Sequence, residues 1–487
     1  MPGRKTTLAV AAAAIALLLV HAAISGCDHD EVQHLHGAWL VSQGKVPFRD
    51  FLEQRHPVIY YALAPAVRSF EGSPRALIFA VRALDLMLLV ASLAVFLRLV
   101  RPLVRDRDVL WPVLLLLGCF FFARNSMEVR PDPWMSLSCL LALWQWASYL
   151  RGGKLWNAAL AGLCVGIAIA ILQKAFAFAG LLAIGTIPAA LGGRERLVRA
   201  ARGGGVAIAA ALVPLAVLVL LVRRAGIWSD FVFWNYTFNR FYYLATQYEG
   251  PSAAAVVGIS VGEDALLWIG GFAGLWLTLR RFRQLADQPE IALSAAVVIG
   301  ILASLFQSRW PFSHNLLLMQ PALGVLAVAA LEELRDRRRR TAAGVLLVLL
   351  VAKMGVMCFT YDEGHGNVAI EGRILALTDP TDPVAAAPPY HPIFRRDSFF
   401  FWYVPLNNAQ AYLECCRRFG CPLGKVEHDL AAWRIDPPTV VYLPADEPSW
   451  APVGFPAYRN QYRATDVAGL FARRPPPDRG QAATNPQ

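Results

Sequence analysis

The sequence has little charge for its length. Only 17% of its 487 residues are Asp, Glu, Lys or Arg, whereas 56% are hydrophobic and the mean hydropathy is positive. Soluble globular domains carry about 25% charged residues, so this composition excludes a soluble fold and predicts a polytopic membrane protein. The net charge is +11, but the basic residues fall in short clusters between apolar runs. That pattern is typical of membrane loops, and we expect no nucleic-acid partner.

The sequence also lacks the cysteine patterns of metal or redox sites. Its eight cysteines are scattered, with no Cys-x-x-Cys pair and no zinc-finger spacing to histidine, so most are expected to be small apolar core residues. Whether Cys415 or Cys416 pairs with Cys421 is left open. A Ser-His-Asp set or clustered metal ligands, as a membrane hydrolase or phosphatase would need, is not evident either.

Eleven apolar segments are expected to span the membrane, since a helix needs about 20 apolar residues to cross it. They cover residues 7–25, 76–97, 109–123, 133–150, 156–172, 175–191, 204–222, 264–279, 290–306, 315–331 and 341–359. The fifth and sixth come from one apolar run that only Gln173-Lys174 interrupts, which predicts a tight turn. A lipoprotein signal peptide ending at Cys27 is the alternative for the first segment. Because ten later spans already hold the protein in the membrane, an acyl anchor would add little membrane affinity. We therefore expect residues 7–25 to be a span that is retained in the mature protein.

Lys and Arg clusters occur in alternate loops. They lie at 4–5, 98–107, 151–154, 194–202, 280–283 and 335–340. All six fall on one side of the eleven-span topology, which the positive-inside rule predicts to be cytoplasmic. The N-terminus is then inside. The acidic and aromatic loops, including the first one over 26–75, and the C-terminal tail are outside.

The composition changes to Pro, Asp, Tyr and Arg after residue 359. We expect an all-α membrane domain over 1–359, a small exported α/β domain over 360–474 and a disordered tail over 475–487. Within the exported part, 427–433 is predicted to be helical and 439–443 to be a strand.

Carboxylates gather directly after the first span. Asp28, Asp30 and Glu31 suit an N-terminal cap of a helix that runs to about Gln43 and ends at Gly44. Capping alone is one interpretation, but three carboxylates exceed what a cap requires. The helix is amphipathic enough to lie in the membrane interface. A divalent metal on Asp28 and Asp30 is a further possibility, because they form an Asp-x-Asp pair.

Cations and further carboxylates follow in the other outer loops. Arg55 and His56 in the first loop, with Arg49, could neutralise a phosphate leaving group, and snorkelling to lipid headgroups is the alternative. The second outer loop contains Glu128, Arg130 and Asp132, and Asp132 before Pro133 also suits a helix start. Two later turns add cationic side chains that could reach a phosphate or could also snorkel: Lys174, and Arg309 with His314.

The order of these motifs resembles that of bacterial membrane glycosyltransferases of the C-type superfamily (GT-C). The resemblance covers about residues 5–330 and is to protein O-mannosyltransferases, the lipid A aminoarabinose transferase and lipopolysaccharide-core glycosyltransferases. Its motifs are the carboxylate pair after the first span, Gly44-x-x-Pro47-Phe48-x-Asp50, His56-Pro57-x-x-Tyr60-Tyr61, Glu128 to Asp132, Lys174, and the Pro311 to Pro321 phrase. Asn315 departs from the family pattern, in which an aromatic residue is usual.

The resemblance implies transfer of a hexose or pentose from a polyprenyl-phosphate-linked donor to an envelope glycolipid, polysaccharide or protein on the outer face of the bacterial inner membrane. No cofactor beyond a possible divalent metal is implied. Asp30 is our choice of base, with Glu31 or Asp132 assisting in orientation. Arg55, His56, Arg130 and Lys174 would hold the phosphate, with Glu128 and His314 nearby.

Two alternatives of other classes stay open. A flippase or transporter of a lipid-linked sugar would carry charged or broken positions near the middle of several spans. Few are found, notably Arg82 and Asp85. A non-catalytic envelope scaffold is the other alternative, which the joint presence of Asp30, Glu128 and Asp132 makes less attractive.

Overall fold

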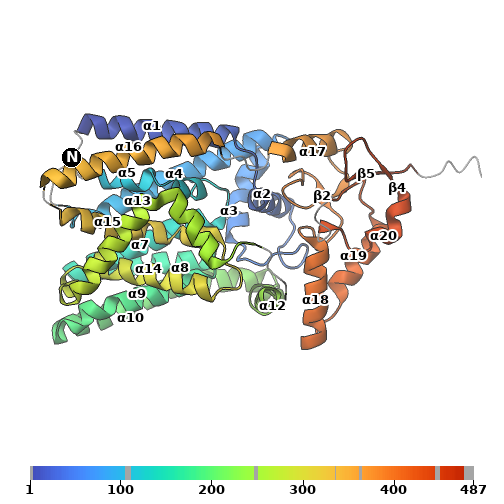
Figure 1. The fold of residues 1–487 in the computed structure, drawn as a ribbon. Helices are drawn as coiled ribbons and strands as arrows, with labels where there is room; N and C mark the ends of the chain where they lie inside the picture. Colours follow the sequence, from blue (N-terminus) through green and yellow to red (C-terminus); the bar gives the residue numbers. More distant parts are fainter. Residues whose placement is uncertain are drawn as a thin grey trace, which may run out of the picture.

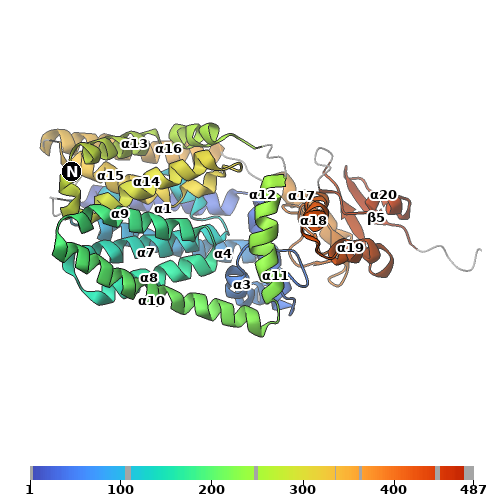
Figure 2. The same ribbon diagram turned by 90° about the horizontal axis from the view of Figure 1, so that it is seen from below.

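The computed structural model describes residues 4–104, 111–245, 250–334, 336–360, 365–444 and 450–475. A bundle of long helices occupies one end of the molecule, and a smaller region of helices and short strands lies at the other (Figure 1). We call residues 365–475 the C-terminal region. Between the two lie the shorter helices α2 (His29–Ser42), α3 (Val58–Ser69), α11 (Trp228–Val232) and α12 (Asn239–Ala245). Figure 1 labels α2, α3 and α12, and Figure 2 labels α3, α11 and α12.

The bundle forms from the apolar runs of the sequence. Its helices are α1 (Arg4–Ile24), α4 (Pro74–Val100), α5 (Trp111–Leu117), α6 (Phe120–Asn125), α7 (Pro131–Gly152), α8 (Leu155–Ile171), α9 (Ala175–Leu191), α10 (Arg194–Arg224), α13 (Ala253–Arg280), α14 (Pro289–Gln307), α15 (Met319–Glu332) and α16 (Asp336–Thr360), with short 3-10 turns η2 (Phe282–Asp287) and η3 (Ser313–Leu316). The turn predicted at Gln173-Lys174 is confirmed between α8 and α9. The span expected over 109–123 is instead two short helices, because the chain breaks at Gly118 and Cys119; residues 109 and 110 lie outside the described part.

Five of the described helices are long and apolar enough to cross a membrane: α1, α4, α10, α13 and α14. Four shorter apolar helices accompany them, in α8, α9, α15 and the Val348–Thr360 part of α16. Large apolar side chains on α10 face outward, with Leu212 57% and Val213 58% exposed. Such exposure is costly in water and ordinary in lipid. The eleven-span count itself stays a prediction.

Glycines let α8 pack closely on α10. A Cβ added to Gly162 would lie 1.9 Å from the carbonyl oxygen of Ala207, and one added to Gly166 would lie 2.3 Å from that of Ala211. The two glycines are four residues apart, so they share one helix face. Small residues at this spacing allow helix backbones to approach in membranes, where apolar burial alone gives little association.

Helices α2 (His29–Ser42) and α3 (Val58–Ser69) belong to the first predicted outer loop. Helix α2 begins where predicted, and the Glu31 carboxylate accepts a hydrogen bond from the backbone N–H of Asp28 (3.1 Å). It ends before Gly44, whose positive φ of 81° suits glycine. The expected position in the membrane interface is wrong, because every side chain from Glu31 to Leu40 is buried within the protein.

The C-terminal region contains α17 (His365–Ala376), α18 (Pro405–Phe419), α19 (Gly424–Ile435), α20 (Phe455–Tyr458), the 3-10 turn η5 (Arg459–Gln461) and a sheet of β1 (Pro383–Ala385), β2 (Arg396–Asp397), β3 (Val440–Tyr442), β4 (Tyr462–Ala464) and β5 (Leu470–Arg473). The strand order is β2-β1-β3-β5-β4; β1 runs parallel to β2 and β3, and β5 is antiparallel to its neighbours. Cys416 pairs with Cys421. The predicted helix and strand fall on α19 and β3. The domain boundaries stay predictions, and residues 476–487 of the predicted tail lie outside the described residues.

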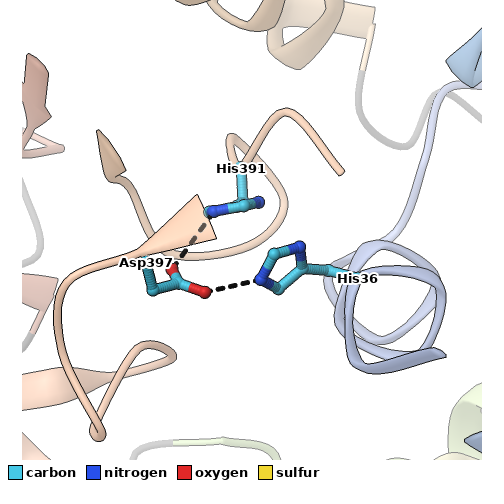
Figure 3. Close-up of side chains that lie close together, drawn as sticks. All are labelled: His36, His391 and Asp397. Atoms are coloured by element: carbon cyan, nitrogen blue, oxygen red, sulfur yellow. Dashed lines mark hydrogen bonds and ion pairs between the residues drawn. The ribbon is translucent and has the colours of Figure 1, made fainter. Parts of the chain in front are cut away.

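The C-terminal region shares a hydrophobic core with the first loop and with α11 (Trp228–Val232), the π-helical turn η1 (Phe233–Phe238) and α12 (Asn239–Ala245). Phe48 and Trp234 from the membrane part and Phe401 and Tyr412 from the C-terminal region belong to this one cluster. His36 of α2 also meets Asp397 of β2 at 2.6 Å (Figure 3). The two parts are therefore joined by both apolar and polar contacts.

Candidate active site

A cavity of about 880 Å³ opens at the end of the bundle that faces the C-terminal region. Its lining comes from residues within 28–33, 54–55, 130–132, 172–174, 239–244, 307–315 and 403–404. The lining combines carboxylates, cations and aromatic rings. Helix packing thus brings together side chains from loops that are far apart in the sequence.

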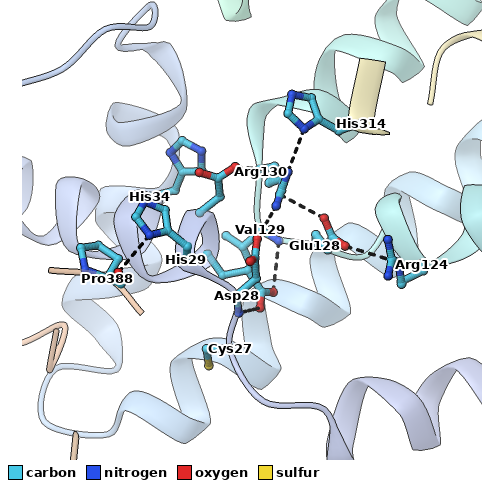
Figure 4. A network of polar contacts seen from close by, with 12 residues as sticks. Cys27, Asp28, His29, His34, Arg124, Glu128, Val129, Arg130, His314 and Pro388 are labelled. Atoms are coloured by element: carbon cyan, nitrogen blue, oxygen red, sulfur yellow. Dashed lines mark hydrogen bonds and ion pairs between the residues drawn. The ribbon is translucent and has the colours of Figure 1, made fainter. Parts of the chain in front are cut away.

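Arg130 is the centre of the charge network beside this cavity (Figure 4). It directly precedes α7, whose first helical residue is Pro131. Its guanidinium pairs with Asp28, with Asp30 (3.1 Å) and with Glu128 (3.0 Å). It also lies 3.1 Å from Nδ1 of His314. One arginine of the second outer loop therefore organises the carboxylates that follow the first span.

Asp30 lies between two arginines. In addition to Arg130, the guanidinium of Arg55 is 3.6 Å from its carboxylate. Burial by itself raises the pKa of Asp30, but the positive charges of Arg130 and then Arg55 outweigh it and hold the pKa well below its usual range. Asp30 is consequently ionised at neutral pH.

Asp132 forms a second pair across the cavity with Lys174, which the turn between α8 and α9 presents. Burial raises the pKa of Asp132, whereas the Lys174 ammonium and His314 lower it, and the net shift is downward. Lys174 also donates to the side-chain oxygen of Asn315 at 3.2 Å. The residue that departs from the family pattern thus holds Lys174 in place.

Three predicted site residues do not line the cavity. Glu31 faces away and binds Arg82 at 2.7 Å. His56 is buried, with Nδ1 2.8 Å from the carbonyl of Ile169. Glu128 lies behind Arg130, and burial is the main reason that its pKa is raised to about 7.

Sequence reasoning missed several lining residues. Tyr242 and Tyr243 come from α12, Trp310 precedes the 313–316 turn, and Tyr403 belongs to the C-terminal region. The run Phe241-Tyr242-Tyr243 in an outer loop was a usable signal for the first two. Nothing in the sequence marks Tyr403, because its place depends on how the C-terminal region docks.

The pair Asp28 and Asp30 does not fit a metal ion as it stands. Both carboxylates contact Arg130, so the chain itself supplies their countercharge. A metal between them would have to displace the guanidinium of Arg130 from two of its three carboxylate partners. The chemistry proposed below therefore uses no metal at this position.

The sequence matches no protein-family model and no curated protein. The structure resembles the crystal structure of ArnT from Cupriavidus metallidurans bound to undecaprenyl phosphate, with a TM-score of 0.70, 13% identity and coverage of 96% of this chain and 98% of that one. The apo form of the same protein gives a TM-score of 0.66 over the same shares, again at 13% identity. The Archaeoglobus fulgidus oligosaccharyltransferase in complex with zinc and sulfate gives 0.51 at 13% identity, over 75% of this chain and 56% of that one. The chain therefore shares the overall fold of ArnT, as the resemblance predicted.

Proposed function

We propose that this chain is an integral membrane glycosyltransferase that moves a sugar from a polyprenyl-phosphate-linked donor to an acceptor on the extracytoplasmic face of the bacterial inner membrane. The observation that carries the proposal is the cavity itself, in which Asp30 and Asp132 lie with Arg55, Arg130 and Lys174. A carboxylate and several cations in one cleft are what sugar transfer with a phosphate leaving group needs. The likeness to a fold that has been crystallised with undecaprenyl phosphate supports it.

The cations are assigned to the leaving group. A polyprenyl phosphate gains negative charge as the sugar departs, and guanidinium groups bind phosphate through several hydrogen bonds. Arg130 and Arg55 line the cavity and converge on Asp30, and Lys174 reaches it from the turn between α8 and α9. Large apolar side chains exposed on neighbouring helices would accommodate the lipid tail.

Asp30 is assigned as the base. The acceptor oxygen or nitrogen attacks the anomeric carbon, its proton passes to the Asp30 carboxylate, and the bond from that carbon to the phosphate oxygen breaks with its electron pair on the phosphate. A carboxylate held by two arginines is a weak base. A phosphate that binds Arg130 and Arg55 would share their charge, and we expect it to raise the pKa of Asp30 towards its ordinary value. Direct displacement of this kind inverts the anomeric configuration.

The remaining predicted residues receive positioning roles. Asp132 orients Lys174, and His314 contacts Arg130. Glu128 sits behind Arg130, while Glu31 secures the start of α2. His56 fixes the first loop against α8 through the carbonyl of Ile169.

The test compares envelope glycolipids and glycoproteins by mass spectrometry in a strain that lacks this protein and is complemented with single variants. Wild type is expected to add a hexose- or pentose-sized mass that Asp30→Asn lowers by about 10²- to 10⁴-fold, the usual contribution of a general base. Asp50→Asn is the matched control, because Asp50 lies in the same loop, pairs with exposed Arg49 and does not line the cavity. Membrane abundance of each variant is measured alongside.

Two results contradict parts of the proposal. If Asp30→Asn restores the product as well as wild type does, Asp30 is only a helix-start residue and the assignment of the base fails. If no glycan changes with any variant, the transferase proposal fails, and a transporter or a scaffold explains the chain better.

A further inference from the structure

A second cluster of reactive side chains lies where α2 meets the C-terminal region (Figure 3). His36 comes from α2, His391 from the loop before β2, and Asp397 from β2. Both histidines are fully buried, and the Asp397 side chain is only 8% exposed. None of the three lines the cavity of the candidate active site. The cluster is therefore separate from the chemistry proposed above.

The hydrogen bond of His36 to the backbone fixes its tautomer. Its Nδ1 lies 2.7 Å from the carbonyl oxygen of Ile393. A carbonyl can only accept, so Nδ1 carries the hydrogen and the lone pair of the neutral ring is on Nε2. That Nε2 lies 2.6 Å from Oδ2 of Asp397. A lone pair and a carboxylate oxygen that face each other need a cation between them: a second proton at this distance, or a metal ion once the two atoms have moved slightly apart.

His391 points to the same requirement independently. Its Nε2 pairs with Oδ1 of Asp397 at 3.2 Å, whereas its Nδ1 has no hydrogen-bond partner among the described residues. A fully buried ring nitrogen without a partner is costly. Its ring centroid is 4.0 Å from that of His36. Both rings thus face the same carboxylate, one toward each of its oxygens.

The donor set selects the class of metal. One ligand atom from each of the three residues lies within 4.8 Å of the others. Imidazole nitrogens with one carboxylate suit zinc and similar divalent transition metals, whereas calcium and magnesium prefer oxygen ligands alone. A backbone carbonyl on the second nitrogen of a histidine, as Ile393 provides here, is the usual support of a metal-bound imidazole.

We propose that His36, His391 and Asp397 bind one divalent transition metal ion of the zinc class, which fastens the C-terminal region to α2. The site is structural, because its side chains are buried. It also bears on the cavity, since α2 carries Asp30 six residues before His36. The metal would hold that helix in one position relative to β2.

The test uses the full chain in detergent, purified without chelator and with an affinity tag that contains no histidine. Elemental analysis is expected to find about one zinc per chain. After chelation, Co²⁺ should give the visible bands of a histidine- and carboxylate-bound ion, and Zn²⁺ should raise the melting temperature. His391→Gln and Asp397→Asn should abolish all three effects.

His428→Gln is the control variant. His428 also contacts an aspartate, since Nδ1 is 3.0 Å from Asp429, but its side chain is 59% exposed. This variant should behave as wild type, which separates the buried site from weak binding by a surface pair.

Two outcomes would overturn the proposal. Suppose that wild-type protein, after treatment with chelator, binds no Co²⁺ at stoichiometric concentration and that added Zn²⁺ does not change its melting temperature. The cation between His36 and Asp397 is then a proton. If both site variants retain as much zinc as wild type, the metal lies elsewhere. The wild-type Co²⁺ titration decides the question even if a variant does not fold.

Discussion

Arg82 ties the end of the first span to the start of α2. Besides Glu31, it donates to the carbonyl oxygens of Ala22 (2.9 Å), Ser25 (3.1 Å) and Gly26 (2.7 Å). Both partners of the Arg82 and Glu31 pair are at most 7% exposed. A buried ion pair contributes little more to stability than a pair of apolar side chains of similar size would. Removal of only one partner, however, leaves the other charge buried without a countercharge, which is strongly destabilising.

Glu31→Gln should therefore destabilise the protein strongly. We expect a loss of about 3–5 kcal/mol in the free energy of unfolding, the typical cost of breaking a buried pair. The measurement is unfolding of the detergent-solubilised protein followed by circular dichroism. Glu414→Gln is the control, because Glu414 pairs with Arg417 on the surface (52% and 74% exposed) and such pairs contribute at most about 1 kcal/mol. Equal effects of the two changes would contradict this role for Glu31.

His34 predicts how stability depends on pH. It is fully buried beside Tyr60 and Arg55. Burial and then the Arg55 charge lower its pKa to about 3. The unfolded chain, with an ordinary histidine pKa of about 6.5, binds more protons between these two values. The free energy of unfolding therefore falls as the pH decreases through this window.

We expect His34 alone to cost about 2 kcal/mol between pH 7 and pH 5. His34→Gln removes the titrating group and keeps a polar side chain near Tyr60. The variant should lose less stability than wild type over the same interval, measured as melting temperatures at both pH values. Parallel curves for the two proteins would show that His34 is not the group responsible.

At the scale of elements, the contact between α8 and α10 depends on two glycines. Gly162→Ala places a methyl group where the backbone of Ala207 already lies, so the helices must separate. We expect a loss of about 1–3 kcal/mol in the free energy of unfolding, as for overpacked interiors.

Gly180→Ala in α9 is the control, because nothing lies within 4 Å of its added Cβ. That change should be neutral or slightly stabilising, since Ala favours a helix over Gly. Thermal unfolding of both variants tests the difference, and an equally stable Gly162→Ala would contradict the close packing.

The elements were predictable to the degree that local composition determines them. The apolar runs of the sequence predicted where the bundle helices lie, and Gly44 predicted where α2 ends. The burial of α2 was not predictable, because its amphipathic pattern suits a protein interior as well as a membrane surface. The charged residues of the cavity were predictable because they fall in loops that the topology places on the same side of the membrane. Their pairings were not, since contacts such as Arg130 with Asp28 depend on how distant loops pack.

At the scale of the whole molecule, the predicted orientation places the candidate active site outside the cytoplasm. Ser69, at the end of α3, is exposed and belongs to the first predicted outer loop, whereas exposed Lys154 directly precedes α8 in a basic loop predicted to be cytoplasmic. In spheroplasts, an impermeant maleimide should label Ser69→Cys but not Lys154→Cys until the membrane is opened. The partly exposed Cys27 and Cys164 are replaced beforehand. Labelling of Lys154→Cys in sealed spheroplasts would reverse the orientation.

The shared core between the first loop and the C-terminal region sets an order of events during biosynthesis. His36 and Asp397 are separated by 361 residues, and Leu52 pairs its backbone N–H with the carbonyl of Phe400. At translation rates of about 5–20 residues per second, the helix that carries Asp30 waits roughly 20–70 seconds for its partner. Until then, the part of that helix that packs on the C-terminal region stays uncovered, although α3 already covers another part of it. A nascent chain therefore has no complete cavity until the C-terminal region, which supplies Tyr403, has been synthesised.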